Sequence, residues 1–335
     1  MTETPRERTV GVTAGSAFDL SVEETVFDGL DVTLRPVDIE TTDDLIHELA
    51  GVDAVIDRLL AAPYTADVID GLNRCEVIAR CGIGVDGIDA EYAATRGMYV
   101  VNVPVYCQDE VSEHTIMLLL ALERNLSTYD SAMHDGLWAQ DVTTEHIHRL
   151  RGQTLGLVGF GTIAQLVAEK AQAFGMDIIA SDPYIDEAEM SRAGVQKVTF
   201  EKVLDAADAV SLHAPLIEET RGKMDAAAFE QMQDTAYLIN VTRGGLVVED
   251  DLVDAVHAEE IAGAGLDVFE TEPSSQGDAF PQFESPLCDL DSVILTPHIA
   301  WFSQEANKER RWTAARDVRR VLDGSAPENP INEPQ

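Results

Sequence analysis

The sequence predicts an α/β fold of two domains, each built on a parallel β-sheet, and three observations lead to this expectation. The chain has 335 residues, which is enough for two domains with sizeable hydrophobic cores. Short apolar segments alternate with helical segments along nearly its whole length, as in parallel sheets whose strands are joined by helices. One of these alternations, between Thr154 and Asp182, contains a glycine-rich turn with a defined spacing.

The first hundred residues are expected to form one of the two sheets. Five apolar segments are its candidate strands: 9–13, 31–35, 54–57, 77–81 and 99–102. Two glycines follow the fourth segment, at the end of a parallel strand where ligands bind. The N–H groups of Ile83, Gly84 and Val85 are therefore candidates for holding a substrate carboxylate. Alternatively, the glycines of this loop only shape a turn.

A helix that begins near Asp109 is expected to lead the chain into the second domain. Its segment 115–122 is apolar on nearly all sides, which predicts that the helix is buried. Val103–Gln108 precedes this helix and is a candidate hinge. Residues 127–149, which include Trp138, show no clean hydrophobic period. We expect them to form an arm that packs on another surface, such as a second subunit.

The segment 154–182 has the order strand, glycine turn, helix, strand and acid that is typical of a dinucleotide-binding unit. Gly159 permits the tight turn, and Gly161 lets a pyrophosphate approach the backbone. Ala164 lets the helix pack closely on the first strand. The alternative is that this short pattern is a tight turn in an unrelated α/β protein.

The helix of this unit, 162–174, offers N–H groups and the positive end of its dipole to phosphates. The other candidate cofactor-binding residues of the turn are Phe160, Thr162 and Ile163. Asp182 lies 23 residues beyond Gly159, near the spacing at which a carboxylate meets the adenosine ribose. Because a carboxylate there repels a 2′-phosphate, the sequence favours NAD over NADP.

Beyond this unit the alternation resumes. The candidate strands are 197–199, 209–213, 236–241, 262–268 and 292–295. Three of them run into polar segments at their carboxyl ends: NVTRGG (240–245), DVFETEP (267–273) and TPHIAW (296–301). Chemistry is expected at that edge of a parallel sheet. A last helix, 304–322, is expected to return to the first domain.

The charge of the chain is its unusual property, because 61 acidic residues against 23 basic ones give a formal net charge of −38. A nucleic-acid-binding protein would carry the opposite sign, so that class is disfavoured. Such a surface repels itself at low salt and is screened at high salt, which predicts a salt-loving source organism. An ordinary acidic protein is the alternative.

The sequence also disfavours a membrane span, a secreted location and a metal site. No apolar run reaches the roughly 18 residues of a membrane span, and the polar start does not resemble a signal peptide, so a cytoplasmic location is expected. The four cysteines show no CxxC spacing and are expected to be reduced and mostly buried. His146 and His148 form a pair, but no partner lies at metal-site spacing, so no metal is expected.

The polar segments and the glycine turn together resemble the D-isomer-specific 2-hydroxyacid dehydrogenases, from about Val77 to about Trp301. The resemblance implies a Rossmann-type NAD-binding domain over 105–301 and a flavodoxin-like substrate domain formed by 1–104 and 302–335. It also implies that Gly82–Asp86 is the loop for the substrate carboxylate. The catalytic residues that it implies are Arg243, Glu272 and His298. The remaining cofactor contacts that it implies are Thr115, His213, Ala214, Pro215, Thr220, Val241, Thr242, Arg243, Asp267 and His298.

The chemistry of the implied catalytic residues is coherent. Histidine has an ordinary pKa near 6.5, so His298 can give a proton to a carbonyl oxygen or take one from a hydroxyl. Glu272 is expected to favour the imidazolium and to fix the ring. Arg243 is permanently charged and forked, which suits it to hold carboxylate and carbonyl oxygens together. These expectations describe a D-specific enzyme that moves a hydride between NAD and a small 2-hydroxy or 2-oxo acid.

Trp301 leaves a second interpretation open. The ending His298-x-x-Trp301 is similar to the C-terminal binding protein branch, whose members are NAD-sensing corepressors, so a binding protein with little turnover is the alternative. Another alternative is a phosphoglycerate, hydroxypyruvate or glyoxylate type of dehydrogenase. Trp301 itself either favours a substrate with an apolar tail or packs between domains. A homodimer through 109–150 is also expected.

Overall fold

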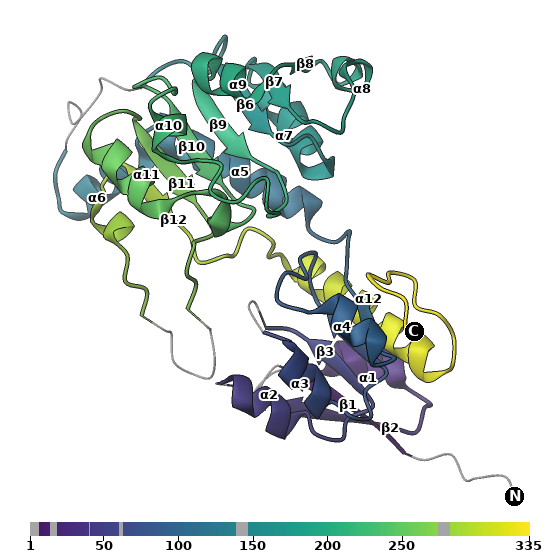
Figure 1. Cartoon of the computed structure of the whole chain (residues 1–335). Helices are drawn as coiled ribbons and strands as arrows, with labels where there is room; N and C mark the ends of the chain where they lie inside the picture. Colours follow the sequence, from purple (N-terminus) through teal and green to yellow (C-terminus); the bar gives the residue numbers. More distant parts are fainter. Residues whose placement is uncertain (1–6, 14–18, 40, 60–62, 139–146, 274–281) are drawn as a thin grey trace, which may run out of the picture. The chain divides into compact units, whose positions relative to one another are not determined.

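The computed structural model describes residues 7–13, 19–39, 41–59, 63–138, 147–273 and 282–335. It confirms the expected α/β class, since two sheets of purely parallel strands alternate with helices along the chain (Figure 1). The chain divides into two compact units. Unit 1 comprises Met1–Tyr106, Pro273–Gln282 and Ser303–Gln335, and unit 2 comprises Cys107–Glu272 and Phe283–Phe302.

Unit 1 is built on a five-stranded sheet in the order β2-β1-β3-β4-β5. This 2-1-3-4-5 order is the flavodoxin-like arrangement. Its strands are β1 (Arg8–Thr13), β2 (Val32–Val37), β3 (Ala54–Asp57), β4 (Val77–Arg80) and β5 (Tyr99–Val101). Its helices are α1 (Ser21–Phe27), α2 (Thr42–Glu48), α3 (Ala66–Gly71), α4 (Ala90–Thr95) and α12 (Gln304–Leu322).

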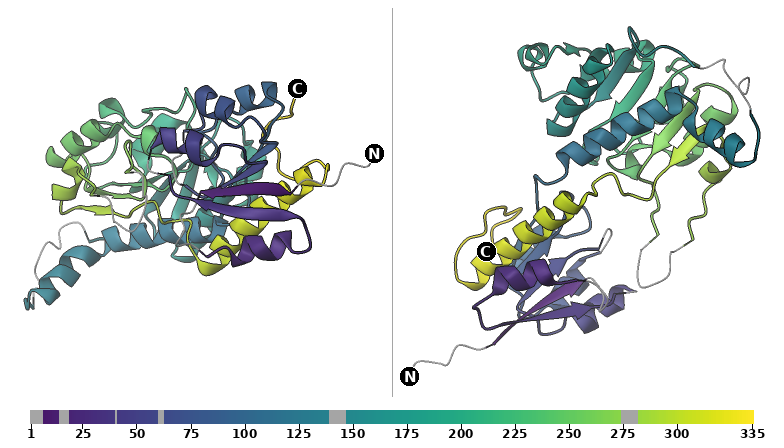
Figure 2. Two further views of the ribbon diagram at one scale, coloured as in Figure 1. Left: turned by 90° about the horizontal axis from the view of Figure 1, so that it is seen from below. Right: turned by 180° about the vertical axis from the view of Figure 1, so that it is seen from behind.

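Helices cover both faces of this sheet, because neighbouring residues of a strand point to opposite sides. Val10 and Ile56 are fully buried in one cluster with Val318 of α12. Val55, which directly precedes Ile56 in the chain, is buried in a second cluster with Leu45 of α2. The C-terminal helix α12 lies beside α1, so the end of the chain completes the unit that the first hundred residues begin (Figures 1 and 2).

Unit 2 is built on a seven-stranded sheet in the order β12-β11-β10-β9-β6-β7-β8. The chain starts in the middle at β6, builds one side through β7 and β8, and then crosses to β9, as in the Rossmann arrangement. The strands are β6 (Thr154–Val158), β7 (Asp177–Ser181), β8 (Gln196–Lys197), β9 (Ala209–Leu212), β10 (Tyr237–Asn240), β11 (Gly263–Leu266) and β12 (Val293–Leu295). The change of direction between β6 and β9 is the point at which such sheets bind ligands.

The helices of unit 2 lie between and over these strands. They are α5 (Gln108–Glu123), α6 (Leu126–His134), α7 (Thr162–Ala173), α8 (Glu187–Arg192), α9 (Phe200–Ala206), α10 (Ala226–Phe229) and α11 (Glu249–His257), with single 3₁₀ turns at Gly244–Leu246 and Pro286–Asp289. Helix α5 contacts α7 and the strands β10 and β11, which makes it the main cover of that part of the sheet. Within the described residues, no helix has the length and apolar character needed to cross a membrane.

Two sequence-based expectations about unit 2 need correction. The strand expected at 197–199 is the shorter β8, because Thr199 instead caps α9 and accepts a hydrogen bond from the Lys202 N–H. Helix α5 is not buried all round, since Met117 is 45% exposed. The expected arm, 127–149, begins as helix α6, none of whose residues is buried. Residues 139–146, including His146, lie outside the described residues.

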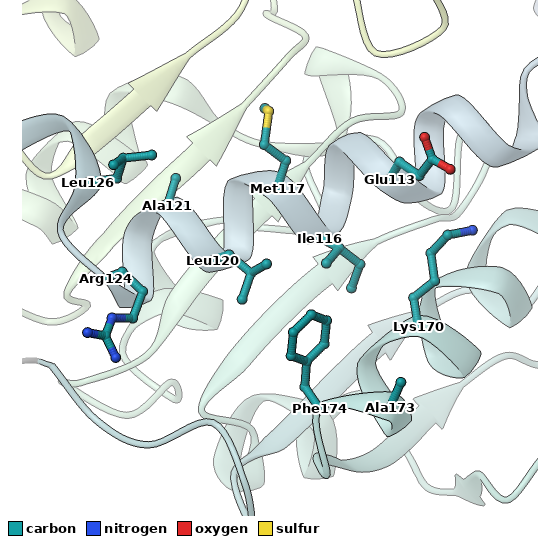
Figure 3. A pocket seen from close by; sticks show the side chains of 10 residues that line it. All are labelled: Glu113, Ile116, Met117, Leu120, Ala121, Arg124, Leu126, Lys170, Ala173 and Phe174. Atoms are coloured by element: carbon teal, nitrogen blue, oxygen red, sulfur yellow. The ribbon is translucent and has the colours of Figure 1, made fainter. Parts of the chain in front are cut away.

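The uncovered side of α5 borders a surface groove of about 690 Å³ (Figure 3). Apolar side chains of α5, of α7 and of the residue after α7 line most of it, among them Ile116, Leu120, Ala173 and Phe174. A helix that is apolar on nearly all sides therefore has one side packed on the sheet and one side open in this chain.

Candidate active site

The glycine turn after β6 has a conformation that only glycine adopts without strain. Gly159 has φ of +92°, and a Cβ atom there would lie 2.7 Å from the backbone carbonyl of His213. The turn is therefore pressed against the end of β9. At Gly161, the N-cap residue of α7, a Cβ atom would meet no atom of the described residues within 4 Å apart from its chain neighbours. Packing within the protein does not require glycine at that position, whereas close approach by a ligand does.

Asp182 connects the glycine turn to the end of β7. Its carboxylate accepts hydrogen bonds from the N–H of Phe160 at 2.8 Å and from the N–H of Tyr184 at 2.7 Å. The acid is half-buried and stands one residue beyond the last residue of β7. It thus holds the turn in place at the position where a ribose is expected.

The 213–220 segment follows β9 and begins beside the glycine turn. Burial lowers the pKa of His213 to about 4, so its ring is neutral. Its Nε2 lies 2.9 Å from the Ser211 hydroxyl, while its Nδ1 is buried and has no hydrogen-bond partner among the described residues. Thr220 donates to the Pro215 carbonyl oxygen at 2.6 Å and closes the loop.

These residues fit the dinucleotide that the sequence predicts. The start of α7 presents N–H groups, the Gly159 and Gly161 backbone leaves room beside them, and His213 offers a buried nitrogen that needs a partner. Of the other predicted contacts, Val241 and Thr115 are buried. The Thr115 hydroxyl donates to the Val111 carbonyl oxygen inside α5 at 2.8 Å.

The end of β10 is shaped by a buried asparagine. Asn240 is fully buried, its side-chain oxygen accepts from the Thr242 N–H at 3.1 Å, and its amide donates to the Arg243 carbonyl oxygen at 2.8 Å. A Cβ atom at Gly244 would lie only 1.9 Å from the Phe269 carbonyl, so the segment after β10 packs tightly on the segment after β11. This contact brings the loop of Arg243 to the loop of Glu272.

His298 and Glu272 form the centre of the site. The His298 Nδ1 lies 2.7 Å from a Glu272 carboxylate oxygen, and both side chains are about one-fifth to one-quarter exposed. Burial alone would raise the pKa of Glu272, but the hydrogen bond and charge of His298, the Phe269 N–H and the charge of Arg243 outweigh it, so the pKa lies below its usual value. The carboxylate therefore stays ionised beside the imidazole, and Arg243 is close enough to act on it.

A buried network behind His298 fixes its backbone, and sequence reasoning missed most of it. His298 has φ of +52°, a left-handed conformation that is uncommon for residues other than glycine. The fully buried Asp267 holds this loop by accepting from the Ile299 N–H at 2.9 Å, the Ala300 N–H at 2.8 Å and the Thr296 hydroxyl at 2.6 Å. Asp267, predicted as a cofactor contact, thus has a defined structural task in this chain.

Thr296 connects this hydrogen-bond network to His114 of α5. Its hydroxyl oxygen lies 2.9 Å from His114 Nε2, and burial, opposed by the charge of Asp267, lowers the pKa of His114. The sequence held a signal for each of these two residues. Thr296 opens the segment TPHIAW, and His114 directly precedes Thr115, a predicted cofactor contact. Trp301 donates its indole N–H to the His298 carbonyl oxygen at 3.0 Å and packs edge-on against Phe302, so it also supports the loop.

The predicted substrate loop lies in unit 1, after β4. The Asn102 amide donates to the Ile83 carbonyl oxygen at 2.7 Å, and the Val103 N–H donates to the Gly82 carbonyl oxygen at 3.0 Å. In the described part of the chain, the N–H groups of Ile83, Gly84 and Val85 donate no hydrogen bond. Three neighbouring donors are thus available to an anion. No cluster of three metal-ligating side chains occurs among the described residues.

Comparisons with known proteins agree with this geometry. Residues 116–300 match the family model for the D-isomer specific 2-hydroxyacid dehydrogenase, NAD binding domain. The chain is 34% identical over 304 residues to D-3-phosphoglycerate dehydrogenase of Mycobacterium leprae, which covers 91% of this chain and 56% of that protein. It therefore spans about half the length of the curated relatives it matches.

Solved structures resemble the whole chain. The TT0316 protein from Thermus thermophilus is 30% identical with a TM-score of 0.84, and the match covers 97% of this chain and 100% of that one. The NAD-complexed D-isomer specific 2-hydroxyacid dehydrogenase from Lactobacillus delbrueckii ssp. bulgaricus is 26% identical with a TM-score of 0.77, covering 96% and 100%. With the family model matching more than half of its residues, the chain belongs to the D-isomer specific 2-hydroxyacid dehydrogenase family.

Proposed function

We propose that the protein is an NAD-dependent, D-specific 2-hydroxyacid dehydrogenase that acts mainly as a 2-oxoacid reductase. The observation that carries this proposal is the 2.7 Å contact between His298 and Glu272, with the charge of Arg243 acting on the same carboxylate. An acid, its tuning carboxylate and a fixed cation then stand together at the carboxyl edge of a nucleotide-binding sheet. The residues proposed to hold NAD are those of the glycine turn, Asp182 and the 213–220 segment.

In this mechanism, bound NADH supplies the hydride for C2 of the oxo acid. His298 gives the proton to the carbonyl oxygen through Nε2, because Nδ1 faces Glu272. Glu272 keeps the ring oriented and stabilises its protonated form before transfer. Arg243 holds the carbonyl oxygen while negative charge builds on it, and the N–H groups of Ile83, Gly84 and Val85 hold the substrate carboxylate.

The experiment that tests the proposal is the loss of NADH absorbance with a panel of 2-oxo acids in molar KCl. Turnover of at least one acid supports the enzyme. Tight NADH binding without turnover of any acid would instead support the corepressor-like alternative. The relatives described above are named as dehydrogenases, which favours the enzyme.

We also propose that the protein is a homodimer formed through α5, α6 and the groove beside them. A single chain leaves large apolar side chains of this region exposed, including Met117 at 45%, Leu126 at 59% and Phe174 at 42%. Helix α6, which buries none of its residues, continues the same surface toward Trp138. Helices whose apolar side has no cover within one chain are commonly covered by another copy.

Light scattering after size exclusion tests the dimer. Leu126→Glu places a charge in the groove and is expected to lower the mass from that of two chains to that of one. Ile331→Glu is the matched control, because Ile331 is a similarly exposed apolar residue of unit 1, 42% exposed, and it is expected to leave the mass unchanged. A wild-type mass of one chain would contradict the proposal.

A salt-loving, cytoplasmic origin is proposed on chemical grounds. The net charge of −38 is expected to make the melting temperature rise steeply between low salt and molar KCl, because screening weakens the repulsion between carboxylates. A flat response of the melting temperature to KCl would remove this proposal. Cys75, Cys81 and Cys107 are buried and form no disulfide with another described residue, which fits a reducing compartment.

A further inference from the structure

Three strands of the unit 1 sheet end in polar residues that stand side by side. In the parallel register, Thr13 at the end of β1 pairs with Asp57 at the end of β3, and Asp57 pairs with Arg80 at the end of β4. The predicted substrate loop, Gly82–Asp86, begins two residues after Arg80. This row of side chains therefore belongs to the edge at which unit 1 is expected to meet the substrate.

The carboxylate of Asp57 neutralises the charge of Arg80 within the protein. Asp57 is 1% exposed, and its two carboxylate oxygens accept hydrogen bonds from the Thr13 hydroxyl at 2.9 Å and from Arg80 Nη1 at 2.8 Å. The Arg80 side chain is only 13% exposed. A buried pair of this kind is electrically neutral as a unit, so Arg80 offers little attraction to a further anion.

A second buried acid neutralises the neighbouring arginines. Glu23 of α1 is fully buried and lies 3.8 Å from Arg58, the residue after Asp57. The same carboxylate accepts from Arg311 of α12, whose side chain also pairs with Asp19. Arg310, the next cation in this cluster, donates to the Cys81 carbonyl oxygen at 3.0 Å.

The charges at this edge leave almost no positive surplus. The four guanidinium groups are those of Arg58, Arg80, Arg310 and Arg311, and the three carboxylates are those of Asp19, Glu23 and Asp57. Four minus three leaves one positive charge, and the exposed Asp86 of the loop itself lies nearby in the chain. The sequence segments after β1 and β3, 14–18 and 60–62, contain no charged residue. Leu59, which follows β3, and Ile83, which follows β4, are apolar, and Ile83 is 37% exposed.

From this charge pattern we infer that the substrate is a 2-oxo acid whose only anionic group is its carboxylate and whose side chain is uncharged and apolar. The inference rests on the function proposed above and narrows its substrate class. A phosphorylated side chain adds a charge of about −1.5 to −2 at pH 7, which the surplus of one positive charge at this edge does not balance. The protein would then differ in substrate from the relatives named D-3-phosphoglycerate dehydrogenase.

The net charge of the whole chain also disfavours a phosphorylated substrate. A net charge of −38 repels a multiply charged anion more than a singly charged one. At molar salt this long-range field is screened within about 3 Å, so the charges that touch the substrate decide the selectivity. The experiment is therefore done at one fixed high concentration of KCl.

The test compares 3-hydroxypyruvate with its 3-phosphate, which differ only in the phosphoryl group, and adds 4-methyl-2-oxopentanoate as the apolar acid. We expect kcat/KM for the 3-phosphate to be lower than for 3-hydroxypyruvate by about 10²-fold or more, since an unpaired charge must be desolvated, and the apolar acid to be the best of the three. Equal or faster reduction of the 3-phosphate would overturn the inference. If no acid is reduced, the proposed function fails, and titration of the same acids against the fluorescence of bound NADH still decides the selectivity.

Two variants distinguish the effect of the charges at this edge from the effect of removing any buried carboxylate. Asp57→Asn removes the charge that neutralises Arg80 and is expected to raise the ratio of kcat/KM for the 3-phosphate over 3-hydroxypyruvate by about tenfold. Asp53→Asn is the matched control. Asp53 is also 1% exposed and bonds Arg74 at 2.9 Å, but it stands before the amino end of β3, away from the ligand edge. An unchanged ratio in Asp57→Asn, or the same rise in both variants, would contradict the inference.

Discussion

The pair of His298 and Glu272 allows a prediction about pH whose size follows from its geometry. Glu272→Gln keeps the shape of the side chain and an oxygen for the Phe269 N–H, but it removes the negative charge 2.7 Å from His298 Nδ1. A hydrogen bond to a charged group contributes about 1.5–3 kcal/mol, and both side chains are less than one-third exposed, so solvent screening reduces this little. One pH unit corresponds to about 1.36 kcal/mol.

The variant is therefore expected to lose reductase activity at a pH about 1–2 units lower than the wild type. Reduction needs the imidazolium, so activity is present at low pH and falls as the ring loses its proton. Glu272 stabilises the charged ring, and removing this carboxylate moves the loss of activity to lower pH.

The measurement is the pH profile of kcat/KM for the best 2-oxo acid, at saturating NADH and constant molar KCl. Glu270→Gln is the control, because it removes the same charge from an exposed neighbour and is expected to leave the profile in place. If the alkaline limb of Glu272→Gln stays within about 0.3 pH units of the wild type, Glu272 does not tune the proton donor. A shift to higher pH would be equally incompatible with the proposed roles.

Three other predictions concern the proton donor, the cofactor and stability. His298→Asn is expected to lower reductase turnover by about 10²–10⁴-fold while NADH fluorescence titrations change little; wild-type turnover in this variant would place the donor elsewhere. Asp182→Ala is expected to reduce the preference for NAD over NADP in kcat/KM, since it removes the charge that repels a 2′-phosphate, and an unchanged ratio would refute that assignment. Burial raises the pKa of Glu123 to about 7, helped by Asp208 and opposed by a hydrogen bond from Gln153, so its neutral form is the one that suits the fold. A raised carboxyl pKa gives stability that is lost as pH rises, so Glu123→Gln is expected to melt above the wild type by a margin that grows from about pH 4.3, the ordinary value, to about pH 7 and then stays constant. A margin independent of pH would contradict this explanation.

Local patterns predicted the strands of both sheets well because each strand is a short apolar run ended by a turn residue. The β6 strand, the Gly159 turn and helix α7 follow one another at the positions that the spacing indicated. The shortest strand, β8, was placed one residue too late, since a two-residue strand has too few side chains to show a period.

Contacts between distant segments were beyond the reach of those patterns. Asp57 and Arg80 are 23 residues apart, and Glu23 and Arg311 are 288 apart, so only the folded sheet reveals that they neutralise each other. The same is true of His114 and Thr296, which are 182 residues apart and meet behind His298. The open side of α5 was missed for another reason, because an apolar helix covered by its own chain and one covered by a second copy have the same sequence pattern.

The left-handed backbone at His298 limits which residues position 298 can hold, apart from any chemistry. Glycine, asparagine and aspartate enter this region with little strain, whereas β-branched residues such as valine and isoleucine enter it at a large cost. In a library of all substitutions at this position, retention of the folded state is therefore expected to rank by backbone preference, with asparagine near the top and isoleucine near the bottom. Asparagine is therefore the substitution expected to remove activity at position 298 without unfolding the protein. The hydrogen bonds that the Ile299 and Ala300 N–H groups donate to Asp267 do not involve the exchanged side chain.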